Sequence, residues 1–117
     1  MTILVETVTP PSQGAFSIDF SLTTEIVVSA EEARRAVGVF VGNEIADLLH
    51  GDAPTLVLKE QGLFWRVPVV LSSRSAGRIG VTGAIDVNAQ TGALMVDANT
   101  LHTIEKNAEY LAAGAAL

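Results

Sequence analysis

Residues 55–97 contain strand-like segments separated by short turns, and this order limits the chain to a small antiparallel sheet. Gln61-Gly62 is typical of a tight hairpin turn, and the turn from Asn88 to Gly92 combines a backbone-capping Asn with a Gly suited to a left-handed conformation. Connections this short join antiparallel neighbours. The pattern predicts strands at Thr55–Glu60, Leu63–Leu71, Ile79–Val87 and Ala93–Asp97.

The second of these segments is apolar on both faces. Trp65 lies in line with three aliphatic residues at alternate positions, so we expect it to pack in the core. Arg66 is the one charged residue on the opposite face. Pro68 has no N–H to donate, so the strand must lie at a sheet edge or direct position 68 away from its partner.

A long helix is predicted before the sheet, from Ala30 to about His50. Ser29 and Glu32 have the spacing of a capping box. Gly38 and Gly42, one helical turn apart, indicate that another element packs closely against this helix. The apolar stripe contains Ala33, Val37, Phe40, Val41, Ile45, Leu48 and Leu49.

The two ends of the chain add further elements. Residues 3–8 and the alternating segment 16–22 predict N-terminal strands within 1–28, and Asn99 is expected to cap a helix over 99–114. We therefore predict one domain over 1–117 of the α+β class. It is an antiparallel sheet of four to six strands, with one long helix packed on a face and a C-terminal helix beside it.

The composition excludes several classes of function. A net charge of −6 disfavours nucleic acids and anionic membrane surfaces, and no apolar run is long enough to span a membrane. The absence of cysteine removes disulfides, thiolate catalysis and cysteine-ligated metals. The N-terminal residues lack the basic region of a signal peptide, so we expect a soluble, cytoplasmic protein.

The segment Trp65-Arg66-Val67, followed by IDVNAQTG at 85–92, resembles the PepSY domain. That family is a small α+β unit with an aromatic-x-Val strand and a later strand that ends in a V-D-A-x-T-G motif. The resemblance covers residues 29–97. It implies a non-catalytic binding or inhibitory module. Ser72–Gly77 is longer than the corresponding family segment, and the terminal elements lie outside the match.

The segment SSRSAGR at 72–78 is the candidate for specific recognition. Arg66, Arg74 and Arg78, with the neighbouring serines, have suitable groups for a small ligand or anion. The alternative is a solvated hairpin loop. The glycines at 77, 80 and 83 fit neither a dinucleotide fingerprint nor a phosphate loop, and glycine within a strand indicates a bulge or a close backbone approach.

No catalytic motif is present, and we expect neither an enzyme nor a cofactor. His50 and His102 are the only histidines, and neither has a second ligand at metal-binding spacing. We therefore expect no metal. The alternative of a small cystatin-like enzyme would require His50 or a strand carboxylate, such as Asp86, in a closed cavity.

The leading functional prediction is a non-enzymatic protein-binding or regulatory module. Its contact surface is expected at an exposed strand edge or apolar surface, with Trp65, Val67 and Pro68 as partner-binding residues. The aliphatic excess also predicts self-association as a homodimer or another homo-oligomer.

Overall fold

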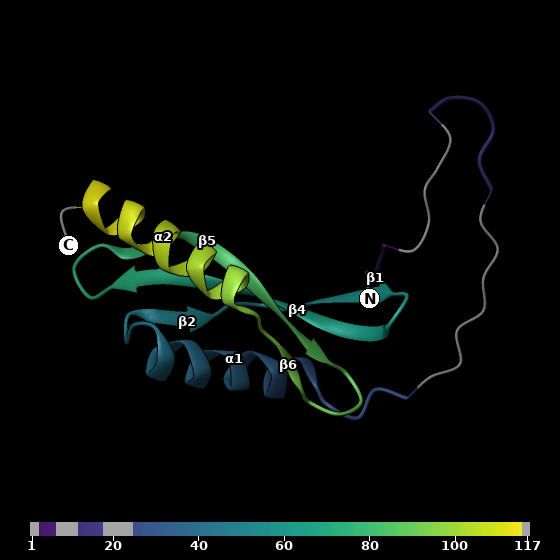
Figure 1. The fold of residues 1–117 in the computed structure, drawn as a ribbon, viewed down its shortest axis with the longest axis horizontal. Helices are drawn as coiled ribbons and strands as arrows, with labels where there is room; N and C mark the ends of the chain where they lie inside the picture. Colours follow the sequence, from purple (N-terminus) through teal and green to yellow (C-terminus); the bar gives the residue numbers. More distant parts are fainter. Residues whose placement is uncertain (1–2, 7–11, 18–24, 116–117) are drawn as a thin grey trace.

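The computed structural model describes residues 3–6, 12–17 and 25–115 (Figure 1). Residues 18–22 of the strand expected over 16–22, and residues 7–8 of the first expected strand, lie outside this range. The helices are α1 (Ala30–Glu44) and α2 (Ala98–Gly114). The strands are β1 (Ile3–Val5), β2 (Leu49–Gly51), β3 (Thr55–Lys59), β4 (Gly62–Ser73), β5 (Gly77–Asn88) and β6 (Leu94–Met95).

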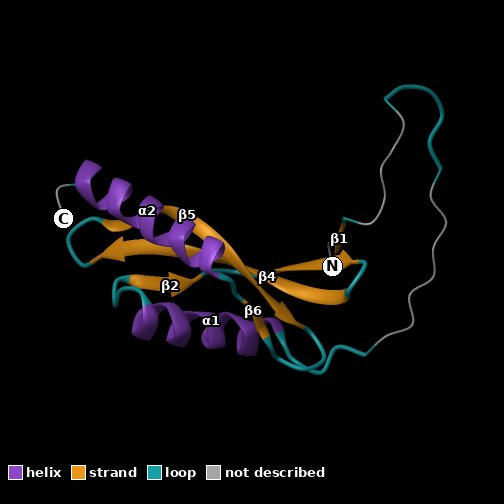
Figure 2. Cartoon of the chain, viewed as in Figure 1, coloured by secondary structure: helices purple, strands orange, loops and turns teal. Residues whose placement is uncertain are grey.

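The fold is α+β as predicted, and the described residues form a six-stranded sheet and two helices (Figure 2). Strands β4 and β5 form a long hairpin at its centre. β3 pairs with the first half of β4 and β2 pairs with the second half, so both occupy the edge of β4 that β5 leaves free. β6 adds to β5. β1 pairs with β3 in the parallel direction, which the expectation of a purely antiparallel sheet did not include.

Pro68 lies in the central strand β4, where its neighbour changes from β3 to β2. Its carbonyl accepts a hydrogen bond from the N–H of Asp52 at 2.9 Å. The nitrogen and carbonyl of one strand residue point to the same edge, so the Pro68 nitrogen also faces away from β5. The missing N–H therefore leaves the β4–β5 pairing intact.

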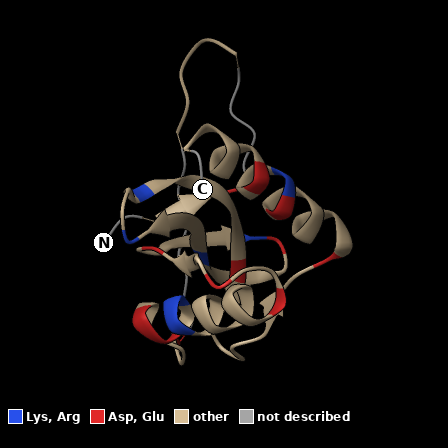
Figure 3. Ribbon diagram, turned by 90° about the vertical axis from the view of Figure 1, so that its left-hand side faces the viewer, with Lys and Arg blue, Asp and Glu red and all other residues tan. Residues whose placement is uncertain are grey.

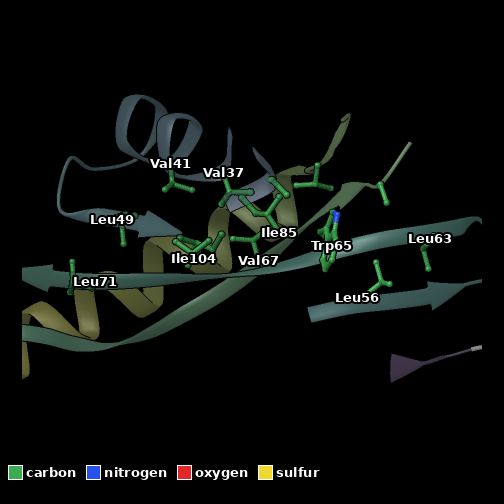
Figure 4. Packing of buried hydrophobic residues seen from close by; sticks show 14 residues of the cluster. Val37, Val41, Leu49, Leu56, Leu63, Trp65, Val67, Leu71, Ile85 and Ile104 are labelled. Atoms are coloured by element: carbon green, nitrogen blue, oxygen red, sulfur yellow. The ribbon is translucent and has the colours of Figure 1, made fainter. Parts of the chain in front are cut away.

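One face of the sheet and both helices form a single hydrophobic cluster (Figure 4). Val37 and Val41 enter it from α1, and Ile104 enters from α2; all three are fully buried. Trp65 is buried as expected, and its indole N–H donates to the Val28 carbonyl at 2.7 Å. The strand residues in the cluster are Leu49, Leu56, Leu63, Trp65, Val67, Val69, Leu71, Ile85 and Val87.

Helix α1 begins where the sequence predicts and ends earlier. The Ser29–Glu32 capping box is present in both directions, but the helix stops at Glu44 instead of continuing to about His50. Leu49 fits the apolar stripe of the predicted helix, but it fits a buried strand position equally well, and in the structure it pairs with Leu71. Pairing with β4 therefore outweighs the helical pattern over residues 49–51. At α2, Asp97 caps the first turn by accepting from the Thr100 N–H, so Asn99 is not the cap.

Glycines permit both helices to lie close to the sheet. Gly38 of α1 is next to Gly51 of β2: an added Cβ at Gly38 would lie 3.6 Å from the Gly51 nitrogen. In β5, a Cβ at Gly80 would approach Leu111, and one at Gly83 would approach Ile104, at 3.1 and 3.0 Å. The spacing of Gly80 and Gly83 thus reflects close packing of α2 on the strand, which agrees with the close backbone approach inferred from sequence.

We predict that Gly51→Ala destabilises the fold strongly. The new Cβ would lie 2.7 Å from the Arg34 carbonyl oxygen and 3.0 Å from Val67 Cγ1, so α1 would have to move away from β2. The expected loss is about 2 kcal/mol or more in the free energy of unfolding, measured by urea denaturation. Gly114→Ala is the control, because nothing lies within 4 Å of its Cβ position. Equal stability of the two variants would contradict this close contact.

Candidate functional site

Arg66 lies at the centre of an ion-pair cluster on the sheet face opposite the helices. Its guanidinium donates two hydrogen bonds to Asp86, at 2.8 and 3.0 Å, and two to Glu6, at 2.9 and 3.1 Å. Lys59 forms a further ion pair with Asp86 and lies 5.0 Å from the centroid of the Phe64 ring. Glu6 follows β1, Lys59 belongs to β3, Arg66 to β4 and Asp86 to β5, so the cluster connects four neighbouring positions in the strand order.

The cluster favours the charged states of Asp86, Glu6 and Arg66. Burial, the largest single effect on Asp86, raises the pKa of its carboxyl, but the hydrogen bonds from Arg66 and Lys59 together outweigh it and hold that pKa below the ordinary 3.8. The hydrogen bond from Arg66 lowers the pKa of Glu6. The same carboxylates raise the pKa of Arg66. Arg66 is therefore a structural cation that donates four hydrogen bonds to two carboxylates.

The other two candidate arginines lie on the β4–β5 hairpin. Arg78 is paired with Asp52, and hydrogen bonds from the Ala53 N–H and from Arg78 lower the pKa of that carboxyl. Arg74 has no ion pair within the described residues. It lines an open hollow of about 300 Å³ together with His50, Ser72 and Ser73. The structure thus does not bring Arg66, Arg74 and Arg78 together in one pocket.

His50 and Ser72 form the one serine–histidine contact in the described part of the chain. The His50 Nε2 atom lies 2.9 Å from the Ser72 hydroxyl, and Nδ1 lies 3.4 Å from the Gly51 carbonyl. Both side chains face solvent, and no carboxylate hydrogen-bonded to the imidazole is seen in the described residues. This pair lacks the third, orienting group of a serine hydrolase site.

Two of the three expected partner-binding residues, Trp65 and Val67, are buried. Trp65 is 7% exposed and Val67 is fully buried, because the central strand β4 lies under α1. Pro68 is partly buried between β2 and β5. The apolar strip around Trp65 and Val67, which was expected to be exposed, therefore belongs to the hydrophobic core.

An open groove, apolar at one end and of mixed polarity at the other, lies between the segment that follows α1 and helix α2. It consists of two adjoining hollows of about 310 and 320 Å³, which share Ala46, Ala108 and Glu109. Leu71 of β4 contributes to the first hollow, and Leu48, 43% exposed, lines it as well. We call this the interhelical groove, defined by Ile45, Ala46, Asp47, Leu48, Leu71, Glu105, Ala108, Glu109 and Ala112.

All charged residues of the interhelical groove are acidic. Asp47 lies on the α1 side, and Glu105 and Glu109 lie on α2. Figure 3 shows acidic positions on both helices. Sequence reasoning missed this groove, because Ala46 and Asp47 were assigned to the long helix. Its one sequence signal is the row Glu105, Ala108, Glu109 and Ala112, which follows helical spacing beside the buried stripe of α2.

The described residues contain neither a membrane-spanning helix nor a cluster of metal-binding side chains. No helix among them is long and apolar enough to cross a membrane. No group of three or more His, Cys, Asp or Glu residues in this part of the chain has the arrangement needed to hold a metal ion.

Comparison with models of protein families, with curated proteins and with solved structures finds no match to this chain. The resemblance to the PepSY domain therefore stays a prediction.

We predict that Asp86→Asn lowers stability at neutral pH and weakens its dependence on acid. The lowered pKa means that the carboxylate stabilises the fold above about pH 4, and that this contribution is lost as the pH falls through the folded-state value. At pH 7 the variant should be less stable by roughly 2 kcal/mol. The difference from the wild type should shrink below about pH 4.

Urea denaturation at a series of pH values measures this difference. Glu60→Gln is the control, because this exposed carboxylate takes part in no ion pair of the described residues. It should change stability by less than about 0.5 kcal/mol throughout. A difference between wild type and Asp86→Asn that does not change with pH would show that the ion pairs are not its cause.

Proposed function

We propose that the protein is a non-enzymatic protein-binding module whose contact surface is the interhelical groove. The observation that carries this proposal is the half-exposed Leu48 beside an open hollow whose lining is almost entirely apolar. Solvent-exposed apolar concavities with a polar rim are typical of protein contact sites. Helix α2 is fixed to the sheet by Ile104, and residues 45–48 on the other side directly follow α1, which Val41 fixes to the same core.

The distribution of polar groups also favours binding over catalysis. Arg66, Asp86, Glu6 and Lys59 form ion pairs with one another, which favours a structural role for these charged groups. His50 and Ser72 lie in a shallow, exposed hollow. Catalytic groups normally act in a cavity that excludes water and holds an orienting residue.

A second candidate function is anion binding at the hairpin. Arg74 is the cation without an ion pair in this region of the described structure, and the hydroxyls of Ser72 and Ser73 line the same hollow. Asp47 lines it too and opposes an anion. Arg78, which is paired with Asp52, does not contribute. We therefore place this function second.

The expectation of self-association also stays a prediction. A two-fold dimer through the interhelical groove would bring Asp47, Glu105 and Glu109 of both copies together. Like charges across an interface disfavour association. The groove thus favours a different protein as the partner.

Affinity capture with matched variants tests the proposed function. Leu48→Ser removes the exposed apolar side chain of the groove, and Val39→Ser makes the same kind of change at a residue of α1 that is 63% exposed and does not line the groove. A specific partner from a lysate of the native cells should be retained by the wild type and by Val39→Ser. Leu48→Ser should reduce its recovery about tenfold, because burying a leucine contributes about 1.5–3 kcal/mol.

Quantitative mass spectrometry of the captured proteins gives the measurement. Thermal unfolding of the two variants checks that both remain folded. Recovery of the same proteins in the same amounts by all three baits would contradict a role for the groove.

A further inference from the structure

We infer that the interhelical groove binds a cationic amphipathic helix of a partner protein. This inference rests on the proposed function and specifies the partner's chemistry. It follows from three properties of the groove: its small side chains, the spacing of the α2 residues that line it, and the sign of its charges.

The walls of the groove suit a helix more than a flat surface. Ala46 on one side and Ala108 and Ala112 on the other are small, so a helix backbone can approach closely between them. Leu71, at the base, is 3% exposed. An apolar side chain inserted there would contact the same core that holds α1 and α2 against the sheet.

The residues of α2 that line the two hollows recur about one helical turn apart, from Glu105 through Ala108 and Glu109 to Ala112. One hollow is lined by Ala108, Glu109 and Ala112, and the other by Glu105, Ala108 and Glu109. One turn of a helix advances about 5.4 Å. A second helix running beside α2 presents residues i and i+3 or i+4 at this spacing, which is the usual pattern of helix-in-groove recognition.

The charges select a basic partner. Asp47, Glu105 and Glu109 surround the apolar lining, and no Lys or Arg belongs to the lining of either hollow. Lys106 on α2 and Arg74 on the hairpin lie outside both of them. The net charge of −6 adds a general attraction for cations.

A second copy of this chain does not supply such a helix from its described residues. In α1, Arg34 donates two hydrogen bonds to Glu31, and Arg35 forms an ion pair with the same carboxylate. In α2, the single basic residue Lys106 is accompanied by Glu105 and Glu109. The cationic helix must therefore belong to a different protein.

The test uses synthetic helical peptides of about 18 residues as probes. The first places leucines at i, i+3, i+4 and i+7 and lysines on the remaining face. The second has the same composition in scrambled order, and the third carries glutamate in place of lysine. Binding to the full-length protein is measured by fluorescence anisotropy from about 0.05 M to about 0.5 M salt.

Protein variants locate the binding. Glu105→Gln/Glu109→Gln removes two groove carboxylates, and Glu25→Gln/Glu60→Gln removes two exposed carboxylates outside the groove with the same change in net charge. We expect the groove pair to weaken binding of the leucine–lysine peptide about tenfold at low salt, and the remote pair to change it less than about twofold. Leu48→Ser should weaken binding about tenfold and Val39→Ser should leave it unchanged.

Three results would overturn the inference. Equal binding of the scrambled peptide would show that general charge attraction alone accounts for the binding. Equal effects of the two carboxylate pairs would show that the peptide binds outside the groove. A preference for the glutamate peptide would show that the groove does not select a basic partner. If affinity capture still finds a partner that depends on Leu48, the proposed function stands and only the chemistry assigned to its partner fails. If the leucine–lysine peptide binds as expected while capture finds no partner dependent on Leu48, the chemistry of the groove holds and the proposed function fails.

Discussion

Strand β4 is the element on which the rest of the fold depends. Its two edges are fully occupied, by β5 on one side and by β3 followed by β2 on the other. One face is covered by the helices, and the opposite face carries Arg66 in the middle of its ion pairs. A strand with neighbours on both edges and packed groups on both faces belongs to the interior of the fold. Pro68 is tolerated in such a strand because it lies at the junction between β2 and β3, where no partner needs its missing N–H.

The two faces of the sheet use their polar residues in different ways. On the face away from the helices, Arg66 joins Glu6, from the segment after β1, to Asp86 of β5, so its charges stabilise the sheet. On the helical side, the carboxylates of Asp47, Glu105 and Glu109 surround apolar surface that lies open. Charges that are mutually paired favour a structural role, whereas carboxylates of one sign beside exposed apolar groups favour recognition. This contrast leads us to place the proposed binding surface between the helices.

Several elements could be read from local residue patterns, while others could not. The Ser29–Glu32 capping box, the core position of Trp65 and the strands over 55–97 follow from short-range periodicity and turn chemistry, and the structure confirms them. The predicted end of α1 was wrong. Leu49 suits both an apolar helical stripe and a strand paired with Leu71, and only the long-range pairing decides between the two. The candidate arginines are a second case in which long-range contacts decide. Whether their side chains meet in one pocket depends on ion-pair partners far away in the sequence, such as Glu6 for Arg66 and Asp52 for Arg78.

The sequence by itself determined the fold class, the capped start of α1 and the central hairpin, because each depends on residues within a few positions of one another. It also determined the net negative charge and the lack of cysteine chemistry. Only the tertiary structure decided which surface is exposed: it left Leu48 partly exposed, placed Arg66 between two carboxylates and brought Ala46 opposite Ala108. The physical reason is that a groove between two helices depends on how each packs on the sheet, and that packing is decided by close contacts such as Gly51 with Arg34 and Gly83 with Ile104.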